Sequence, residues 1–519
     1  MQIDFGNTRN KVIILTLILL LGFVLRVVFF TGYNSGDDRA YIAKAFEYAS
    51  GKYEKPDNHW AVRNGIVFPT TMMIKAFGVN TISVVLIPFI LSMLSMIIAY
   101  KFAFFLSDEK AALLTAMMVA IFPMEVLFAS QLFPYTFLSF FSLVSLYCFV
   151  VGMTRENYSL FFLSGLSLGV AYLCRITALY SLLFFVLYFI FFNRRVDAIL
   201  IFGAGLISIF CVEALLSYFF WNDAVTRYNI LFARAGNPPD LLEKVTNLKW
   251  IAEPWVRPFF EQEFGFFFPV VCFAAVYQLV TRQNTKALIL LLWIVPLFLY
   301  ISYGTTSPTS YQTLRRLPRY YSIIIIPGLI LMSMMLMQLN KKKLRWLIIC
   351  VLSATSLMFL VIDNSKYQKQ PFIAMTEMIK DYPSKNIVID RSLIFDYLFF
   401  TRFKKSEKLS MLVNENDRSD TLKRIKTVYP SVHTINDLKD IDNNTLVVLS
   451  PGYYRLTEIE KQHLKSVQKI YRKGRSYYKL LALKSVRFLL KYVRDDKRLN
   501  MLLNHEKLVA SIYVNEIDP

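Results

Sequence analysis

Cysteine and histidine are scarce in this sequence, which contains five cysteines and four histidines. All five cysteines lie in or at the edge of apolar runs, and their spacing matches neither a disulfide framework nor a zinc site. No histidine stands at metal-ligand spacing from another. The sequence therefore does not identify any cofactor with certainty. It also excludes a small fold that is held together by disulfides.

A glycine-rich phosphate loop is also absent, so neither ATP nor a sugar nucleotide bound at a P-loop or Rossmann motif is expected. No nucleic-acid motif is present, and the net charge of +21 is spread over many short loops between apolar runs. Basic residues in such loops fit topology control and contact with anionic lipid headgroups. We therefore expect membrane lipids, and no nucleic acid, among the partners.

Apolar residues are abundant: 55% of the 519 residues are hydrophobic, and the mean hydropathy is +0.43. This composition is typical of integral membrane proteins, and many runs reach the length that crosses a bilayer. The first run is too long for a signal-peptide core, so we expect it to be retained. We predict an α-helical polytopic membrane protein with about 11 transmembrane helices, over Val12–Phe30, Thr81–Leu106, Ala111–Phe128, Pro134–Gly152, Tyr158–Cys174, Ala178–Phe192, Ala198–Trp221, Phe264–Val280, Ala287–Tyr303, Ser322–Leu339 and Trp346–Ile362.

Lysine and arginine are densest in the short loops on the side of the N-terminus, which predicts a cytoplasmic N-terminus. An odd number of spans then places the C-terminal region outside. The outer face would carry Thr31–Asn80, Asn222–Glu263, Gly304–Tyr321 and the tail from Asp363. Apolar residues recur at helical spacing twice in the first outer loop, which predicts two short helices at the membrane surface.

The composition changes at Asp363 to mixed charge with short apolar segments. We predict a membrane domain over residues 1–362 and a small extracytoplasmic α/β domain over 363–519. Its expected strands are Asn386–Asp390, Thr445–Ser450 and Tyr477–Leu483. Its expected helices are Ser419–Val428 and Leu456–Tyr471, and the last 35 or so residues are interpreted as a helical surface segment.

Two adjacent carboxylates, Asp37 and Asp38, follow the first span and open the first short helix. Acidic residues are common at helix N-termini, so a purely structural role is one interpretation. At the outer membrane surface a carboxylate also suits a general base for an acceptor hydroxyl or amine. The pair would equally suit a divalent metal that binds substrate phosphates. Spacing alone does not separate these roles.

Several arginines stand on the predicted outer face, against the usual bias of basic residues toward the cytoplasm. Arg175 lies in a very short outer turn, where it would either reach for the interface or contact a lipid-linked phosphate. Arg315, Arg316 and Arg319 cluster in the last outer loop. A lipid phosphate is the economical partner for that cluster.

Aromatic and polar residues mix beside these charges, as is typical of sugar-binding sites. Tyr41, Arg63 and Tyr320 are the candidates for binding the sugar or the acceptor. Glu125 and Glu213 lie in apolar surroundings and would either face a cavity or be structural acids. Together these residues favour group transfer from a phosphate-bearing lipid at the outer membrane face.

Four segments carry a family resemblance. The sequence Asp37-Asp38-Arg39-Ala40-Tyr41 resembles the acidic signature in the first outer loop of GT-C glycosyltransferases, most closely of the protein O-mannosyltransferase and aminoarabinose-transferase type, family 39. Three further segments resemble motifs of that family, in the same order and on the same predicted side: Arg63–Pro69, Gly165–Ala178, and Arg319-Tyr320 followed by Pro327.

This resemblance implies a GT-C fold, a polyprenyl-phosphate-linked monosaccharide donor and an inverting transfer. It makes Asp37 the catalytic acidic residue and Asp38 the second acidic position, and it assigns Arg175 and Arg319 to the lipid phosphate. Arg63 stands near the place where aminoarabinose transferases have an acidic metal ligand. A metal is therefore in doubt, with Asp37 and Asp38 as the ligands if one is used.

The acceptor stays open among a lipid, a glycan and a protein. A transporter or flippase of lipid-linked sugars is the alternative from another class, but no two-fold repeat supports it. An O-antigen-type polymerase or ligase would need no acidic pair after the first span. The lysine-rich inner loops fit a bacterial plasma membrane, with the active site on the extracytoplasmic face.

Overall fold

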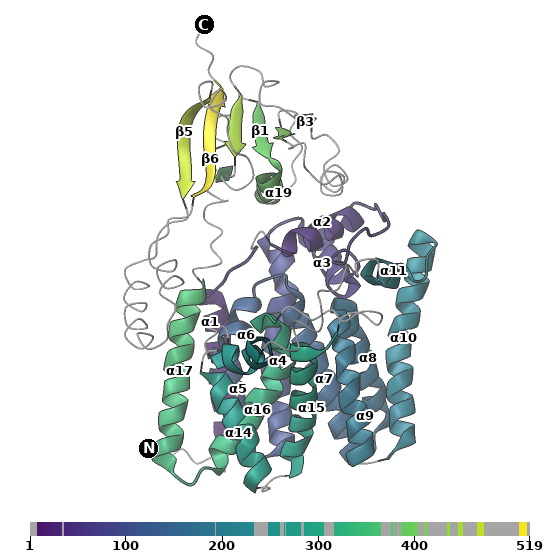
Figure 1. Cartoon of the computed structure of the whole chain (residues 1–519), viewed down its shortest axis with the longest axis vertical. Coiled ribbons are helices and arrows are strands. Elements are labelled where there is room, and N and C mark those ends of the chain that lie inside the picture. Colours follow the sequence, from purple (N-terminus) through teal and green to yellow (C-terminus); the bar gives the residue numbers. More distant parts are fainter. Residues whose placement is uncertain are drawn as a thin grey trace. The chain divides into compact units, whose positions relative to one another are not determined.

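We describe the protein from a computed structural model (Figure 1). The structure describes residues 8–33, 36–192, 194–232, 248–259, 264, 266–281, 285–305, 316–364, 375–376, 379, 386–402, 409–412, 433–435, 445–449, 464–471 and 508–515. This part of the chain is mostly helical, and a sheet forms in the C-terminal region.

All eleven segments that were predicted to span the membrane are helical. The helices are α1 (Thr8–Val28), α4 (Thr81–Leu106), α5 (Glu109–Ile121) with α6 (Pro123–Phe128), α7 (Pro134–Arg155), α8 (Tyr158–Cys174), η1 (Ile176–Ser181) with α9 (Leu182–Phe191), α10 (Val196–Trp221), α14 (Phe267–Thr281), α15 (Thr285–Tyr303), α16 (Ser322–Gln338) and α17 (Lys342–Asn364). In the part that the structure describes, seven helices are long and apolar enough to cross a bilayer, namely α1, α4, α7, α10, α15, α16 and α17. The chain is a multi-pass membrane protein.

One predicted span is broken. The segment Ala111–Phe128 forms α5 and α6, which are separated at Phe122, and α6 begins with Pro123. Proline lacks a backbone N–H and disfavours helical geometry in the residue before it, so the helix ends there and a new one starts at Pro123. Both short helices are almost completely buried, which is compatible with irregular backbone at membrane depth.

The membrane helices run side by side in a bundle (Figure 1). The most buried of the seven long helices is α16, which packs against α5, α7, α14 and α15. In contrast, α1, α10 and α17 expose many large apolar side chains. Such surfaces suit contact with lipid chains.

Two glycines bring α8 and α10 into close contact. A Cβ atom on Gly165 would lie 1.9 Å from the carbonyl oxygen of Phe202, and one on Gly205 would lie 2.3 Å from that of Phe162. Only glycine permits backbones to approach this closely, as is common between membrane helices. This contact fixes α8, whose C-terminal end carries Arg175.

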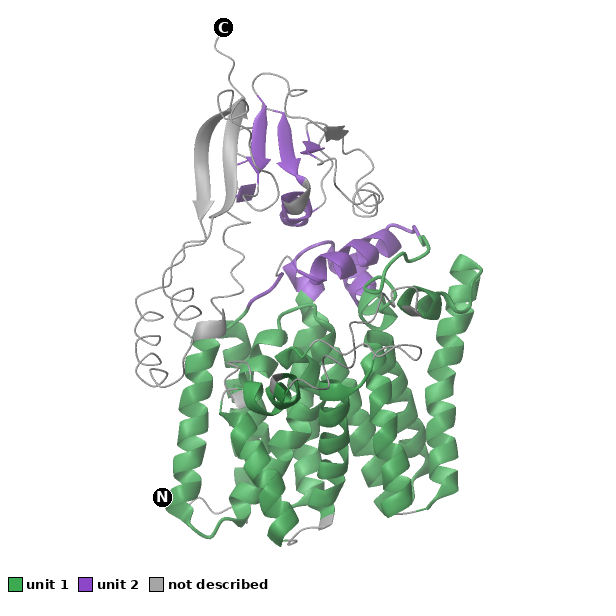
Figure 2. Cartoon of the chain, viewed as in Figure 1, with its two compact units in different colours: residues 1–30, 53–69, 85–363 green, residues 31–52, 70–84, 364–519 purple. Residues whose placement is uncertain are grey.

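The chain divides into two compact units (Figure 2). The membrane unit comprises residues 1–30, 53–69 and 85–363, and the second unit comprises 31–52, 70–84 and 364–519. The segment between α1 and α4 contains the two predicted short helices, α2 (Asp38–Ala49) and α3 (Asn64–Phe77).

The second unit contains a six-stranded sheet with strand order β3-β2-β1-β4-β6-β5. Its strands are β1 (Ile387–Asp390), β2 (Leu409–Leu412), β3 (His433–Ile435), β4 (Leu446–Leu449), β5 (Leu464–Tyr471) and β6 (Leu508–Asn515). β1 to β4 pair in parallel, and β6 pairs antiparallel with both β4 and β5. The helix α19 (Arg391–Phe400) follows β1 and packs on β1 and β2.

The strands that were predicted at Asn386–Asp390 and Thr445–Ser450 are confirmed as β1 and β4. The predicted helix Leu456–Tyr471 is wrong over Leu464–Tyr471, which is β5, and the predicted helical tail contains β6. Pairing with neighbours distant in sequence outweighs helix propensity in these segments. The segments predicted at Ser419–Val428 and Tyr477–Leu483 lie outside the described residues.

Candidate functional site

The carboxylate pair lies at the start of α2. Asp37 occupies the N-cap position, but its side chain makes no capping hydrogen bond. Asp38 is buried, and its Oδ1 accepts a hydrogen bond of 2.6 Å from the backbone N–H of Gly36. Asp38 therefore closes the turn that precedes the helix, while the half-buried carboxylate of Asp37 does not serve as a helix cap. This difference favours Asp37 over Asp38 for chemistry.

One residue before the carboxylate pair in the chain and one residue after it donate hydrogen bonds to the same carboxylate on α19. The hydroxyl of Tyr33 donates to Asp396 Oδ1 at 2.5 Å. The guanidinium of Arg39 donates to the same carboxylate through Nε at 3.3 Å and through Nη2. Asp396 is fully buried and lies within the same compact unit as the pair. The loop that bears the carboxylates is therefore fixed to the α/β sheet.

Two of the predicted phosphate-binding arginines share one aromatic ring. The guanidinium carbon of Arg175 lies 4.0 Å from the ring centre of Tyr320 and 5.1 Å from that of Tyr135. That of Arg319 lies 5.7 Å from Tyr135 and 5.9 Å from Phe133. These contacts form one cluster. We call it the arginine–tyrosine site, and it consists of Arg175, Arg319, Tyr135 and Tyr320.

This site holds positive charge that no acid of the described residues neutralises. Within that part of the chain, no carboxylate lies within ion-pair distance of Arg175 or Arg319, and the buried Nε of Arg319 has no hydrogen-bond partner. Arg175 is only 8% exposed. Arg319 is half-buried, and cation–π contacts offset part of the cost of burying Arg175. The remaining donors suit an anion.

Arg63 lies in the vicinity of this site, because its charge interacts with Tyr320. The carbonyl of Arg63 accepts hydrogen bonds from Ile66 and Val67, which starts α3. Tyr41 has a different place: it is fully buried in α2, and its unit is not the one that holds the arginine–tyrosine site.

Arg227, which the sequence analysis missed, holds the end of α8. It lies in the short helix α11 (Thr226–Phe232), and its Nη2 donates to the carbonyl of Tyr172 at 2.6 Å. Its Nη1 donates to the carbonyl of Leu173 at 3.3 Å and to Glu213 Oε1 at 3.0 Å. Arg175 follows directly after this held turn. The sequence signal for Arg227 was a basic residue in a loop that was predicted to be outside.

The two acids in apolar surroundings each have a side-chain partner, which favours the structural interpretation. Glu213 on α10 pairs with Arg227, as described above. Glu125 on α6 accepts a hydrogen bond of 3.5 Å from Ser139. Its carbonyl accepts one of 3.2 Å from Ser92, which in turn accepts from the fully buried Arg26 of α1 at 2.9 Å. This network joins α1, α4 and α7 to the break between α5 and α6.

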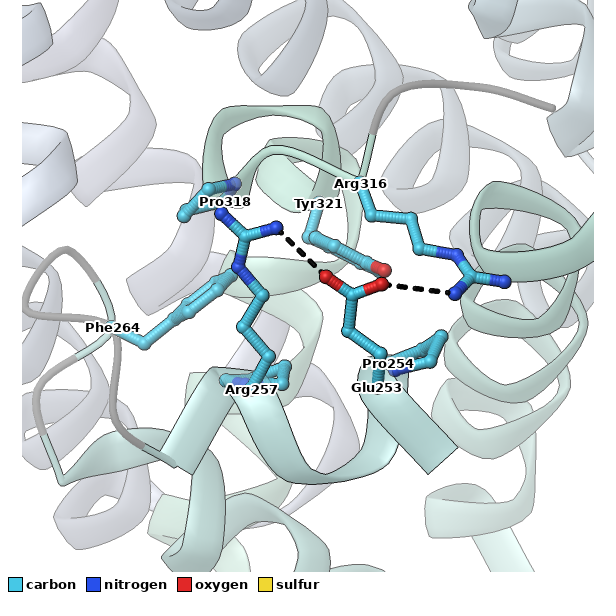
Figure 3. A pocket seen from close by; sticks show the side chains of 8 residues that line it. Glu253, Pro254, Arg257, Phe264, Arg316, Pro318 and Tyr321 are labelled. Carbon is cyan, nitrogen blue, oxygen red and sulfur yellow. Dashed lines mark hydrogen bonds and ion pairs between the residues drawn. The ribbon is translucent and has the colours of Figure 1, made fainter. Parts of the chain in front are cut away.

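Arg316 contacts a carboxylate, unlike Arg175 and Arg319. Glu253 of α13 (Leu248–Val256) lies between Arg257 and Arg316, at 3.1 and 3.3 Å, in the pocket of Figure 3. Arg316 also donates to the carbonyls of Ser302 at 2.9 Å and Trp250 at 2.5 Å. These bonds favour a structural role for Arg316, which joins α13 to α15. Arg315 lies outside the described residues.

A metal centre finds little support in the side chains. Within the described ranges, no group of three or more histidine, cysteine, aspartate or glutamate side chains is placed to hold a metal ion. Asp38, one of the two predicted ligands, already accepts a hydrogen bond from the backbone of its own turn. No chemical step below depends on a metal.

Residues 66–218 match the family described as dolichyl-phosphate-mannose-protein mannosyltransferase. No curated protein matches the chain. The matched region contains α4 to α9 and most of α10, and thus both Tyr135 and Arg175, but neither the carboxylate pair nor Arg319.

The fold is similar to that of two solved proteins. ArnT from Cupriavidus metallidurans is 14% identical in its apo state, with a TM-score of 0.56, and the match covers 88% of this chain and 95% of that one. Its structure bound to undecaprenyl phosphate is 13% identical over 96% and 97% of the two chains, with a TM-score of 0.54.

The second solved protein is the oligosaccharyltransferase AglB from Archaeoglobus fulgidus, in complex with an inhibitory peptide and a dolichol-phosphate. It is 12% identical over 90% of this chain and 74% of that one, with a TM-score of 0.51. The shared fold and the family match confirm the resemblance that the motifs indicated. The chain has the GT-C fold of these solved proteins, and its residues 66–218 are similar to the mannosyltransferase family.

Proposed function

We propose that this protein transfers a monosaccharide from a polyprenyl-phosphate-linked donor to a lipid, glycan or protein acceptor at the outer face of the plasma membrane. The observation that carries the proposal is the arginine–tyrosine site, where two guanidinium groups contact Tyr135 and no described carboxylate neutralises them. Solved proteins of the same fold were bound to undecaprenyl phosphate and to dolichol-phosphate, which supports a phosphate of this kind.

In this proposal Arg175 and Arg319 bind the donor phosphate. A planar guanidinium offers forked donors that match phosphate oxygens, and such charge-assisted hydrogen bonds are strong. Negative charge develops on the phosphate as the sugar leaves, so cations held in advance stabilise the transition state more than the ground state. The burial of Arg175 strengthens this effect because water screens buried charges poorly.

Asp37 is proposed as the general base. It removes a proton from the acceptor hydroxyl or amine, whose freed electron pair attacks C1 of the sugar. The bond between C1 and the phosphate oxygen breaks at the same carbon, and polyprenyl phosphate leaves with that electron pair. Attack from the opposite side inverts the anomeric configuration. Asp38 would keep Asp37 in place, because it closes the turn before α2.

The proposed sidedness rests on the basic loops. The density of lysine and arginine predicts that the N-terminus is cytoplasmic and that the loops bearing Asp37, Arg175 and Arg319 are extracytoplasmic. A bacterial plasma membrane is part of the proposal. Arg63 and Tyr320 are proposed to contact the sugar or the acceptor, whereas the burial of Tyr41 in α2 gives it a packing role.

The first experiment measures binding of undecaprenyl phosphate to the purified full-length protein, with undecaprenol as the ligand that lacks the phosphate. We expect Arg175→Met and Arg319→Met to weaken binding of the phosphate about tenfold or more, since each removes a charged hydrogen-bond donor. Arg155→Met is the matched control, because Arg155 is exposed at the other end of α7 from Tyr135. Equal affinity for undecaprenol and for its phosphate would refute the assignment.

The second experiment follows sugar transfer from a panel of labelled undecaprenyl-phosphate monosaccharides in membranes. Asp37→Asn keeps the size of the side chain and removes the base, so transfer should be lost at normal expression. Glu54→Gln removes an exposed carboxylate of the same outer loop and should leave transfer unchanged. Movement of the labelled lipid across the membrane without transfer would favour the flippase, and extension of a glycan by preassembled units would favour the polymerase.

A further inference from the structure

The buried carboxylate of Asp396 is the common acceptor for two residues that flank Asp37 and Asp38. Tyr33 precedes the pair and Arg39 follows it, and both donate to this carboxylate. Asp396 stands 363 residues after Tyr33 in the chain, on a helix of the α/β domain. Along the chain, the carboxylate pair thus lies between two residues that are both anchored to the side chain of Asp396.

Stacking adds to the first anchor. The ring of Tyr33 lies parallel to that of Phe399, with centroids 4.2 Å apart, and edge-on to Phe400 at 5.8 Å. Tyr33 is 1% exposed. Burial and the neighbouring Asp396 raise the pKa of Tyr33 well above its ordinary value, so its hydroxyl keeps the proton that it donates.

The second anchor is an ion pair. The side chain of Asp396 is fully buried and that of Arg39 is 31% exposed. A buried carboxylate is costly unless it is paired and hydrogen-bonded, and the contacts above with Tyr33 and Arg39 satisfy Asp396. Removing its charge therefore weakens both anchors at once.

The geometry points to Asp396, Tyr33 and Arg39 as positioning residues, through which the α/β domain holds the catalytic carboxylate pair in its working place. This inference rests on the proposed function, because it gives the C-terminal domain a part in the same reaction. The helix that carries Asp396 packs on β1 and β2, so the anchor is as rigid as the sheet. Groups held to within a fraction of an ångström by rigid elements react faster than loosely held ones.

The test compares Asp396→Ala, Asp396→Asn and Asp396→Glu in the full-length protein. We expect Asp396→Ala to lower kcat about 10- to 100-fold, as a displacement of about 1 Å at the reacting groups does. Asp396→Asn should lose less, because its amide oxygen still accepts from Tyr33, and Asp396→Glu should recover part of the rate. The affinity for undecaprenyl phosphate should stay unchanged in all three variants, because no arginine of the phosphate site changes.

A double-mutant cycle separates positioning from general damage. If Arg39 acts only through Asp396, Arg39→Met combined with Asp396→Ala should lower kcat no further than Asp396→Ala alone. The control is Thr401→Val, which removes a hydroxyl bound to the carbonyl of Tyr397 at the end of α19 and should leave kcat unchanged. A folded Asp396→Ala variant with the kcat of the wild type would overturn the inference.

Hydrogen exchange makes the test independent of activity. In the Asp396→Ala variant the backbone amides of Arg39 and Ala40, which bond to Gly36 and Asp37, should exchange at least several-fold faster than in the wild type. Unchanged exchange would overturn the inference even if the wild type transferred no sugar. Absence of transfer by the wild type, with faster exchange in the variant, would count against the proposed function alone.

Discussion

The substitution Arg227→Met should be among the most destabilising single changes in the membrane unit. Arg227 donates to the carbonyls of Val62, Tyr172 and Leu173 and to the carboxylate of Glu213, at distances between 2.6 and 3.3 Å. Both charged side chains are at most 7% exposed. Removing the cation leaves Glu213 charged and buried without its partner, which costs about 3–5 kcal/mol of stability.

The assay is equilibrium unfolding of the purified protein in mild detergent by titration with a denaturing detergent. The double variant Arg227→Met with Glu213→Leu removes both charges, so it should recover much of the loss, because replacing a whole buried pair by apolar groups is often neutral. A cost below about 1 kcal/mol for Arg227→Met, which is the range of exposed ion pairs, would refute the reasoning.

The same substitution should also affect the arginine–tyrosine site, which we propose binds the donor phosphate. The turn that Arg227 holds ends one residue before Arg175. At temperatures where the Arg227→Met variant is folded, we expect weaker binding of undecaprenyl phosphate. A variant with lower stability but the affinity of the wild type would show that the position of Arg175 does not depend on the hydrogen bonds of Arg227.

Three further predictions follow from single contacts. Gly165→Ala should destabilise the bundle by about 1–3 kcal/mol or more in the same unfolding assay, since its Cβ would clash with the carbonyl of Phe202. The control is Gly203→Ala, whose Cβ meets nothing within 4 Å and which should be neutral. Arg175→Lys keeps the charge but loses the forked guanidinium donors and the stacking on the tyrosine rings. Binding measurements should therefore give an affinity for undecaprenyl phosphate between those of the wild type and Arg175→Met. An affinity equal to that of the wild type would argue against recognition by forked donors. Glu253→Gln should cost about 1 kcal/mol, less than Arg227→Met, because this carboxylate is 39% exposed, and a larger loss in thermal unfolding would contradict that ranking.

The membrane helices were largely predictable because each is a long apolar run, and this signal is local in the sequence. The predicted span Tyr158–Cys174 has the same bounds as α8, because the polar residues Asn157 and Arg175 end that apolar run. The break at Phe122 was missed because both halves are apolar, although Pro123 marks it. In the tail, β5 was taken for a helix, since the pairing of β5 with β6 depends on residues that are distant in the chain.

The sequence predicted which residues belong to the candidate site, but not which side chains they contact. The sequence identified Arg175 and Arg316 as equivalent candidates, and only the structure separates them, because Glu253 lies 63 residues from Arg316. Arg227 had no motif to mark it. Its partners, like the carboxylate of Asp396 for Tyr33, come together through the fold and leave no periodic pattern.

The bond between Tyr33 and Asp396 also has a consequence for the order of events during biosynthesis. The loop with the carboxylate pair emerges from the ribosome early, but its anchor is made 363 residues later. At about 5–20 residues per second, translation separates the two by roughly 20–70 seconds. During this interval the membrane helices are inserted while the loop has no anchor. A chain arrested before residue 396 would contain Arg175 and Arg319, and under the proposed function we expect it to transfer sugar more slowly than the full-length protein.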